Sequence, residues 1–407
     1  MINIIDKAKC CGCGACIQKC PKNCISKIID NEGFSYPIVD YNKCIKCGLC
    51  EKVCPCINLG YEKKPLNVYA ATAIDDELRE KSSSGGVFSL LAKNILENGG
   101  IVVGAAFNNE WQVNMICINS ENELHKLRGS KYVQADTCNT FNEINTYLKE
   151  GKKVLYSGTP CQIKALKLFL CKDYINLYTV DVACHGVPSP GVWKKYLYEI
   201  IKPPLNQNTI SEKESYNNRI SLIKEIKFRD KTNGWRNFRV VLKYAQSQTE
   251  NNLLKEISSV HNKNPYFEAF NRSLIIRPSC TECLSKHGKS NSDITIADFW
   301  GIENVLPQLD DDKGVSLVLV NTSKGQQLFD KINLNTKECN YDDALQYNSG
   351  LRGSTLSHPK RHKFFMNYLE KSSISNYIHS LLKESFLLRV KNKLKRILHK
   401  YFNIKIR

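Results

Sequence analysis

The sequence predicts a small, cysteine-rich α+β module at the N-terminus, followed by a larger α/β region. Eleven of the nineteen cysteines fall before residue 57, at short and regular spacings. Beyond about residue 65, helical and strand patterns alternate along the chain, which is typical of α/β architecture. A polar stretch at 202–222 interrupts this alternation. With 407 residues, the chain is long enough for two or three domains. We therefore expect separate segments at 1–60, 65–201, 223–360 and 381–407.

The N-terminal cysteines form an internal duplication. Two groups share the pattern Cys-x2-Cys-x2-Cys-x3-Cys-Pro, and every member recurs at an offset of 34 residues. The members are Cys10, Cys13, Cys16 and Cys20, then Cys44, Cys47, Cys50 and Cys54. In this pattern the first three cysteines hold one 4Fe–4S cluster, and the fourth ligates the other cluster. The spacing predicts a ferredoxin-like module with two clusters, in which Cys54 completes the first triplet and Cys20 the second.

Zinc is the competing interpretation of these cysteines. Zinc favours four tetrahedral ligands, often as two separate Cys-x2-Cys pairs. A zinc site would not require three evenly spaced cysteines followed by Cys-Pro, and this pattern occurs twice. Cys11, Cys24 and Cys56 fall outside the pattern and are expected to be small buried or spare thiols. Between the two groups, apolar runs flank residues 30–33, and this arrangement predicts a β-hairpin.

Residue patterns in the α/β region predict its helices and strands. Apolar residues at 87, 90, 91 and 95 lie on one helical face, and Gly99-Gly100 ends that helix. Pro160 suits the first turn of the next helix. Helices are expected at 87–98, 160–170, 192–201, 265–272 and 323–332. Strands are expected at 101–107, 115–118, 154–156, 177–183, 223–228, 238–244, 293–297 and 315–320.

Composition favours a cytoplasmic protein. Nothing at the start resembles a signal peptide, and no apolar run reaches the roughly 18 residues of a spanning helix. Cytoplasmic thiols stay reduced, so the cysteines are expected to be ligands rather than disulfides. The formal net charge is +18, and each bound cluster with its four thiolates would lower it by about two. The remaining excess favours acidic partners: phosphorylated cofactors, an acidic electron carrier or an anionic membrane surface.

Four later cysteines stand at turns that neighbouring Gly and Pro residues define. They are Cys161, Cys184, Cys280 and Cys283. Four loop cysteines could enclose a third 4Fe–4S cluster. Because they come from three separate places, scattered inert cysteines explain them as well, and a zinc site is a further alternative.

Four motifs are candidates for cofactor contacts. Residues 82–86 read Ser-Ser-Ser-Gly-Gly before a helix; serine caps and glycine amides there would suit a phosphate, although an ordinary capped helix is the simpler interpretation. Lys131 lies beside a turn and could stabilise a reduced flavin's negative charge, although an exposed lysine is common. His185 could relay a proton or simply form local hydrogen bonds. Trp300, in Asp-Phe-Trp-Gly, could frame a cofactor or fill the core.

Taken together, the motifs resemble the β subunit of coenzyme F420 hydrogenase/dehydrogenase, in the form with an N-terminal two-cluster ferredoxin domain. The resemblance covers roughly residues 1–360. It rests on the segments 83–87, 129–134, 158–162, 184–189 and 297–301 and on Cys280-x2-Cys283. It implies an α/β flavin and iron–sulfur region with FAD and with a third cluster on Cys161, Cys184, Cys280 and Cys283. It also implies cofactor contacts from Ser83, Ser84, Gly85, Gly86 and Lys131, and catalytic roles for Lys131 and His185.

The function implied by this resemblance is that of an iron–sulfur flavin-dependent oxidoreductase. Such an enzyme would connect a ferredoxin-like carrier or a partner redox subunit to a small-molecule substrate, because a flavin converts between single electrons and a hydride. The resemblance implies this reaction class but no particular substrate. An electron-transfer subunit or adaptor without its own substrate chemistry is the alternative. A zinc-containing nucleic-acid binder is disfavoured by the doubled Cys-Pro pattern, so we expect no nucleic-acid partner.

The C-terminal segment, 381–407, is basic. Residues 383–407 contain nine Lys or Arg and one Glu. Apolar residues at 387, 390, 394, 397 and 401 would share one helical face. An amphipathic basic helix can lie on an anionic membrane, so peripheral contact with the inner face of a membrane is one expectation. Docking on the protein itself or contact with a partner subunit are the others.

Overall fold

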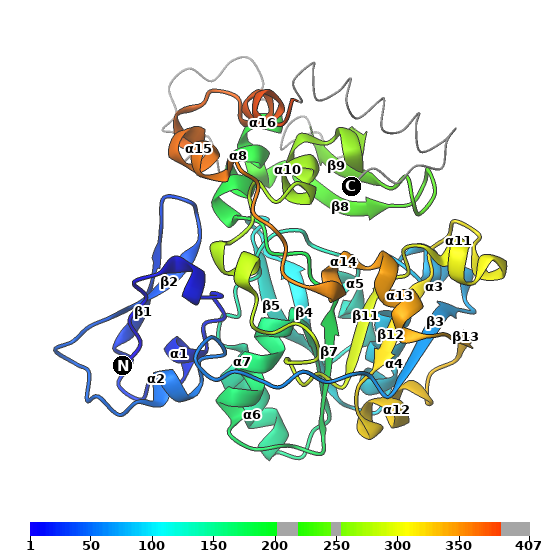
Figure 1. Ribbon diagram of the computed structural model, residues 1–407, viewed down its shortest axis with the longest axis horizontal. Helices are drawn as coiled ribbons and strands as arrows, with labels where there is room; N and C mark the ends of the chain where they lie inside the picture. Colours follow the sequence, from blue (N-terminus) through cyan, green and yellow to red (C-terminus); the bar gives the residue numbers. More distant parts are fainter. Residues whose placement is uncertain (202–218, 246–253, 384–407) are drawn as a thin grey trace.

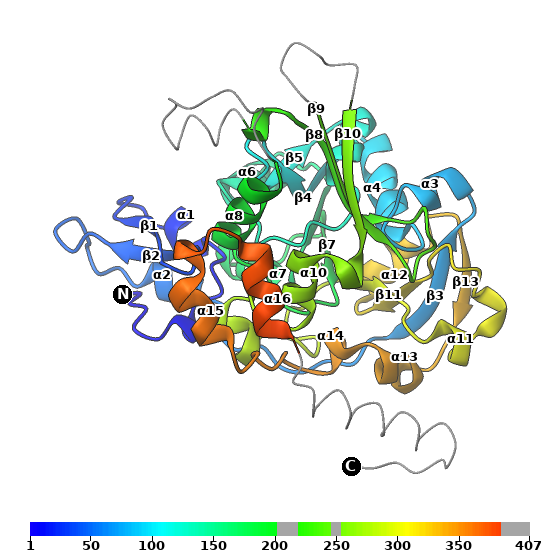
Figure 2. The same cartoon turned by 90° about the horizontal axis from the view of Figure 1, so that it is seen from above.

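A computed structural model describes residues 1–201, 219–245 and 254–383 (Figures 1 and 2). The basic tail from residue 384 and most of the expected polar stretch, 202–218, lie outside the described residues. The N-terminal module lies at the left of Figure 1, beside a large sheet with helices on its faces. A second layer of strands and helices lies above the large sheet in the same view.

The internal duplication is visible in the backbone of the module. Helices α1 (Ala15–Gln18) and α2 (Leu49–Lys52) each begin after a left-handed glycine, Gly14 at φ 70° and Gly48 at φ 74°. Both helices and both glycines are separated by the same offset of 34 residues as the cysteines. Strands β1 (Ile25–Ile29) and β2 (Ser35–Val39) pair antiparallel. The predicted hairpin is therefore confirmed.

The large sheet is mixed. Within the described residues it has eight strands in the order β13-β3-β12-β11-β7-β6-β4-β5. The central strands β11, β7, β6 and β4 run parallel, whereas each of the outer strands is antiparallel to its neighbours. The strands are β3 (Asn67–Ala73), β4 (Ile101–Phe107), β5 (Val113–Ile118), β6 (Val154–Gly158), β7 (Leu177–Val182), β11 (Ile294–Asp298), β12 (Ser316–Val320) and β13 (Leu334–Glu338). Both stretches of the predicted α/β region therefore contribute to one sheet.

Alternating side chains divide the strands between two cores. Val103 and Tyr156 pack on one face with α6 (Thr140–Lys149) and α7 (Pro160–Leu170). Val102 and Leu155, one residue away, pack on the opposite face with α4 (Val87–Glu97) and α12 (Ser323–Phe329). This alternation is the period-two pattern expected of strands that are buried on both faces. The shorter helices around the sheet are α3 (Asp76–Glu80), α5 (Leu124–Leu127), α11 (Ile302–Val305), α13 (Tyr341–Tyr347) and α14 (Ser349–Arg352).

The upper layer has its own core. Strands β8 (Ile223–Asp230), β9 (Arg239–Ala245) and β10 (Leu254–Val260) form an antiparallel sheet in the described part of the chain. Aromatic side chains, among them Trp193, Phe228 and Tyr266, connect this sheet to the helices beside it. These helices are α8 (Pro190–Ile200), α10 (Pro265–Asn271), α15 (Arg361–Asn367) and α16 (Ile374–Leu382). Across the described ranges, every helix is too short or too polar to cross a bilayer.

Candidate functional site

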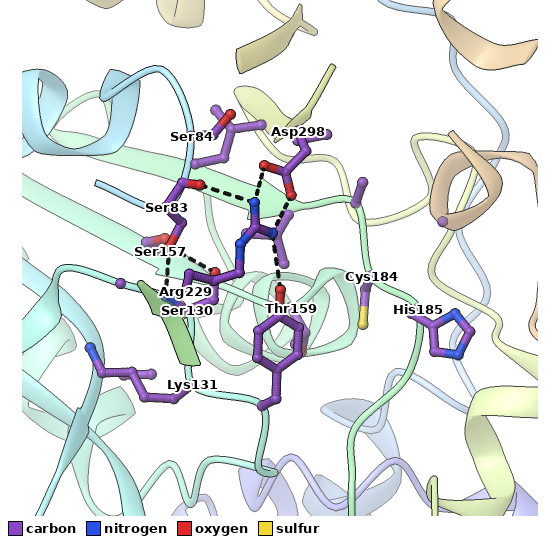
Figure 3. Close-up of a pocket in the computed structure, with 18 of the residues that line it drawn as sticks. Ser83, Ser84, Ser130, Lys131, Ser157, Thr159, Cys184, His185, Arg229 and Asp298 are labelled. Atoms are coloured by element: carbon purple, nitrogen blue, oxygen red, sulfur yellow. Dashed lines mark hydrogen bonds and ion pairs between the residues drawn. The ribbon is translucent and has the colours of Figure 1, made fainter. Parts of the chain in front are cut away.

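A cavity of about 620 Å³ lies at the carboxyl ends of β6, β7 and β11, under the upper layer (Figure 3). Its walls include the serine/glycine loop, the segment around Lys131 and the turn that carries Cys184 and His185. Arg229 and Phe270 contribute from the upper layer. The volume is within the range of small-molecule and cofactor sites, about 300–1,000 Å³. The structure therefore brings together, around one cavity, motifs that are far apart in the sequence.

Arg229 connects three of these motifs. Its side chain is only 3% exposed and forms an ion pair with Asp298, with distances of 2.7 Å from Nη1 to Oδ2 and 2.9 Å from Nη2 to Oδ1. Nη2 also donates to the backbone oxygen of Ser83 (3.1 Å; Figure 3). Nη1 donates to the Tyr132 hydroxyl (3.3 Å). Sequence reasoning missed Arg229, because a single arginine at the end of a strand carries no motif.

The serine/glycine loop differs from the predicted capped helix. The N-cap of α4 is Gly86, and among the described residues no side chain caps this helix. The Ser82 and Ser84 hydroxyls donate to backbone carbonyls instead. The Ser83 hydroxyl accepts a hydrogen bond from the backbone N–H of Ser130 (2.9 Å). The prediction of serine caps is wrong, because the left-handed Gly86 turns the loop so that the hydroxyls bond to neighbouring segments.

Close packing explains the two glycines of this loop. A Cβ at Gly85 would lie 2.3 Å from the Ala71 carbonyl oxygen and 2.8 Å from the Ser316 nitrogen. The Gly85 N–H donates to the Ser316 hydroxyl (3.0 Å), and Gly86 has a φ of 94°. The loop therefore lies directly against β3 and β12, at the edge of the cavity.

Lys131 is half-buried in the cavity wall. Its Nζ donates to the backbone oxygens of Lys126 and Arg128, each at 2.8 Å. Burial lowers the pKa of Lys131 to about 7. In Figure 3 this side chain lies apart from the Arg229–Asp298 pair. Its amine can gain or lose a proton near neutral pH, which suits a role beside a group whose charge changes. That role stays a prediction.

His185 lies on the other side of the cavity in the view of Figure 3. Its Nε2 is 3.1 Å from the Ser273 hydroxyl, and its ring meets the edge of Phe270 at 5.0 Å. Burial, together with the charge of Lys286, lowers the pKa of His185. The imidazole is therefore neutral at physiological pH, and hydroxyl groups of Ser273 and Thr355 lie beside its two nitrogens. Its catalytic role stays a prediction.

Two small cavities in the module have the composition of the predicted crossed ligand sets. One is lined by Cys10, Cys13, Cys16 and Cys54, which we call the inner cage. The other is lined by Cys20, Cys44, Cys47 and Cys50, which we call the outer cage. The inner cage faces the body of the protein, since the adjacent Cys11 also lines the large cavity. In the outer cage, Cys47 is exposed.

The chemistry of these thiols fits iron–sulfur clusters. Burial raises the pKa of Cys16, and the neighbouring Cys13 and Cys10 raise it further. Such thiols ionise only when a metal charge compensates them. Throughout the described ranges, no three Cys, His, Asp or Glu side chains converge closely enough to hold a single metal ion. A cubane, whose four irons lie apart, needs a wider cage than tetrahedral zinc does.

The four later cysteines also come together, and we call them the third cysteine group. Cys161 lies in the first turn of α7, Cys184 follows β7, and Cys280 lies in a short 3-10 helix (Pro278–Glu282) just before Cys283. Burial raises the pKa of Cys184, and the nearby Cys280, Cys161 and Cys283 raise it further. Cys161 and Cys184 line the large cavity. On the other side, the Lys9 Nζ of the module donates to the Glu282 carboxylate (2.6 Å), next to Cys283. The group therefore lies between the module and the cavity.

The three cysteines outside the pattern adjoin these sites. Cys24 is buried, with its Sγ 3.3 Å from the Sγ of Cys20. Cys56 lines the inner cage cavity, and Cys11 lines both that cavity and the large one. They are half-buried or buried thiols, as expected, but they lie beside the cages rather than in unrelated places.

Comparison with known proteins identifies a family for this chain. The family description "Coenzyme F420 hydrogenase/dehydrogenase, beta subunit" matches with its N-terminal part at residues 68–141 and with its C-terminal part at 151–341. A 4Fe–4S binding domain matches residues 37–56. The chain belongs to this β-subunit family. Members of the F420 hydrogenase/dehydrogenase β-subunit family are subunits of redox enzymes, and this member is an electron-transfer protein with 4Fe–4S binding.

Among solved structures, this β-subunit family member is similar to a chain in the F420-reducing [NiFe] hydrogenase complex from Methanosarcina barkeri. The two chains are 18% identical, the similarity covers 68% of this chain and 83% of that one, and the TM-score is 0.42. No curated protein matches the chain.

Proposed function

We propose that this chain is an iron–sulfur flavoprotein oxidoreductase that connects a ferredoxin-like carrier or partner redox subunit to a hydride-accepting small molecule. The order of the sites supports this proposal. The outer cage has an exposed cysteine, the inner cage adjoins the body, and the third cysteine group borders the large cavity. One cluster in each would divide the distance from surface to cavity into short electron-transfer steps. We assign the eight N-terminal cysteines and the third group as ligands.

FAD is the cofactor that we propose for the large cavity. When bound, it would supply the conversion between single electrons and a hydride. Residues 83–86 would lie beside its phosphates, and the Arg229–Asp298 pair would fix this loop relative to the upper layer. Lys131 would hold or release a proton beside it, since burial lowers the pKa of this amine to about 7. Phe270 and neighbouring rings would exclude water.

Electrons would enter at the outer cage. Ile45 and Lys46 lie between two of its cysteines, and both are exposed. Lys22, also exposed, lines the same cavity and adds positive charge. A basic rim around exposed apolar side chains suits an acidic one-electron carrier, because opposite charges steer association.

Substitution Gly85→Ala tests the FAD site. The new Cβ would collide with the Ala71 carbonyl oxygen, and overpacking of this kind costs about 1–3 kcal/mol. We expect FAD to bind the anaerobically purified variant roughly tenfold or more weakly than wild type, measured by titration calorimetry. Gly353→Ala is the matched control, because Gly353 has extended backbone (φ 165°) and open space around it.

Two outcomes of this titration would contradict the FAD proposal. Equal affinity of wild type and Gly85→Ala would exclude the serine/glycine loop as the phosphate site. Wild-type protein that retains its iron but binds no FAD would favour the alternative function, an electron-transfer subunit or adaptor without its own substrate chemistry.

A further inference from the structure

Arg277 is a buried cation at the junction between the module and the body. Its side chain is fully buried, and it comes three residues before Cys280 of the third cysteine group. Nε donates to the Cys10 carbonyl oxygen (2.7 Å), and Nη2 donates to the Ser35 carbonyl oxygen (2.9 Å). Nη1 donates to the amide oxygen of Gln134 (3.0 Å). These acceptors are neutral, so they satisfy the donors without balancing the charge.

The charge of Arg277 faces the inner cage. Its Nη2 lies 3.7 Å from the Cys10 Sγ. Aromatic rings of Tyr36 and Phe34 lie 4.3 and 5.3 Å from the guanidinium carbon. Among the described residues no carboxylate forms an ion pair with Arg277. A guanidinium stays protonated in proteins, and a buried charge requires a compensating charge. A cluster with its four thiolates supplies about two negative charges at that position.

The internal duplication diverges where Arg277 packs. Gly12 of the inner loop corresponds to Lys46 of the outer loop, and both have a left-handed backbone, at φ 70° and 54°. A Cβ at Gly12 would lie 2.7 Å from the Arg277 Nη1 and 2.6 Å from the Gln134 Nε2. The outer loop carries a side chain there and is open to solvent. The glycine of the inner loop is what lets the guanidinium approach that cage.

Other cations near the cages differ from Arg277. Lys27 lines the inner cavity but is paired with Asp136. Lys164 is buried near Cys56, and burial lowers its pKa, whereas a guanidinium keeps its charge. Lys22 and Lys46 of the outer cage are exposed, and solvent and salt screen them. Of the two cages in the module, only the inner one therefore has a permanent and unscreened positive charge beside it among the described residues. The same charge also acts on Cys280 and Cys161 of the third cysteine group.

We propose that Arg277 raises the reduction potential of the inner cluster above that of the outer cluster. Reduction adds one electron and hence one negative charge to a cluster, and a cation in a low-dielectric site stabilises the more negative state. Arg277 therefore favours electron transfer from the outer cluster to the inner one. Its positive charge stabilises the added electron, so no proton has to be taken up. Arg277 is a tuning residue rather than a catalytic one. The inference rests on the ligand sets proposed above.

A redox titration of the anaerobically purified full chain, followed by electron paramagnetic resonance at fixed pH, tests the proposal. Single ligand substitutions, Cys54→Ala and Cys47→Ala, identify the signals of the inner and outer cages, and a signal that persists in both variants belongs to the third cysteine group. In wild type, the inner cluster is expected to have the higher midpoint potential. Arg277→Gln is expected to lower the inner midpoint by about 59 mV or more, which is a tenfold shift of the electron toward the outer cluster, and to leave the outer midpoint unchanged. Arg277→Lys, which restores the charge, is expected to recover most of this shift.

The matched control is the double substitution Arg361→Gln with Glu32→Gln. It removes another guanidinium that joins body and module, with Nη1 3.0 Å from the Glu32 Oε1, but one whose charge is balanced. We expect the midpoint potentials of the inner and outer clusters in this double variant to equal those of wild type. A wild-type outer potential at or above the inner one would overturn the proposal whatever the variants do, and so would equal shifts of both clusters in Arg277→Gln. Absence of clusters from wild type would instead overturn the proposed function.

Discussion

Substitution Cys54→Ala is expected to remove the cluster of the inner cage and to leave the outer one in place. Cys54 belongs to the second sequence group, yet it lines the inner cavity with Cys10, Cys13 and Cys16. A cubane that loses one of its four thiolates loses an anchoring bond at one iron. We expect bound iron to fall by about four per chain, measured on anaerobically purified protein. The signals of the outer cluster should persist.

Cys56→Ala is the matched control for this prediction. Cys56 lies two residues from Cys54 and lines the same cavity, but it falls outside the repeated pattern. We expect its iron content to equal that of wild type. Loss of the outer signals in Cys54→Ala would contradict the crossed assignment. Loss of about four irons in Cys56→Ala would show instead that this cysteine is a ligand.

Substitution Asp298→Ala is expected to destabilise the body by about 3–5 kcal/mol. It leaves the guanidinium of Arg229, 3% exposed, without its counter-charge. It also removes the acceptor for the Trp235 indole N–H, 2.9 Å from the Asp298 Oδ1. The measurement is the shift of the thermal midpoint and of the urea midpoint under anaerobic conditions, with iron content recorded for each variant.

Two further variants separate the cost of the unpaired buried charge from the other effects of Asp298→Ala. The double variant Arg229→Met with Asp298→Leu removes both charges and is expected to be more stable than Asp298→Ala. Glu77→Ala breaks the exposed pair with Lys81 and is expected to cost only about 0.3–0.5 kcal/mol. If Asp298→Ala were as mild as Glu77→Ala, the pair could not be what holds Arg229 in place beside the serine/glycine loop.

Local signals in the sequence predicted much of the fold. Pro160 stands at the start of α7, as expected of a residue without an N–H to donate. Gly99 follows α4 directly after its C-cap, in the left-handed conformation. The repeated Cys-Pro spacing predicted a duplicated cysteine loop. In the structure, both copies have the same left-handed glycine followed by a short helix. In each case the determining residues lie within a few positions of one another.

Elements that depend on distant partners were not predicted. Strand β3 is rich in alanine, which strands disfavour, and it forms because it pairs with β12 and β13. Strand β13 is largely exposed and lacks an apolar pattern. Arg229 and Arg277 carry no motif, since their partners Asp298 and Cys10 lie 69 and 267 positions away along the chain. The serine caps failed because the Ser82 and Ser84 hydroxyls donate to the carbonyl oxygens of Leu78 and Val315 instead.

Iron, zinc and acid-labile sulfide in the anaerobically purified full chain test the cysteine cages most directly. Three clusters predict about twelve irons and about twelve sulfides per chain, with little zinc. About eight irons and eight sulfides would contradict a cluster on the third cysteine group and would still agree with clusters in the inner and outer cages. A colourless preparation, with zinc in place of iron and without labile sulfide, would contradict the cages altogether.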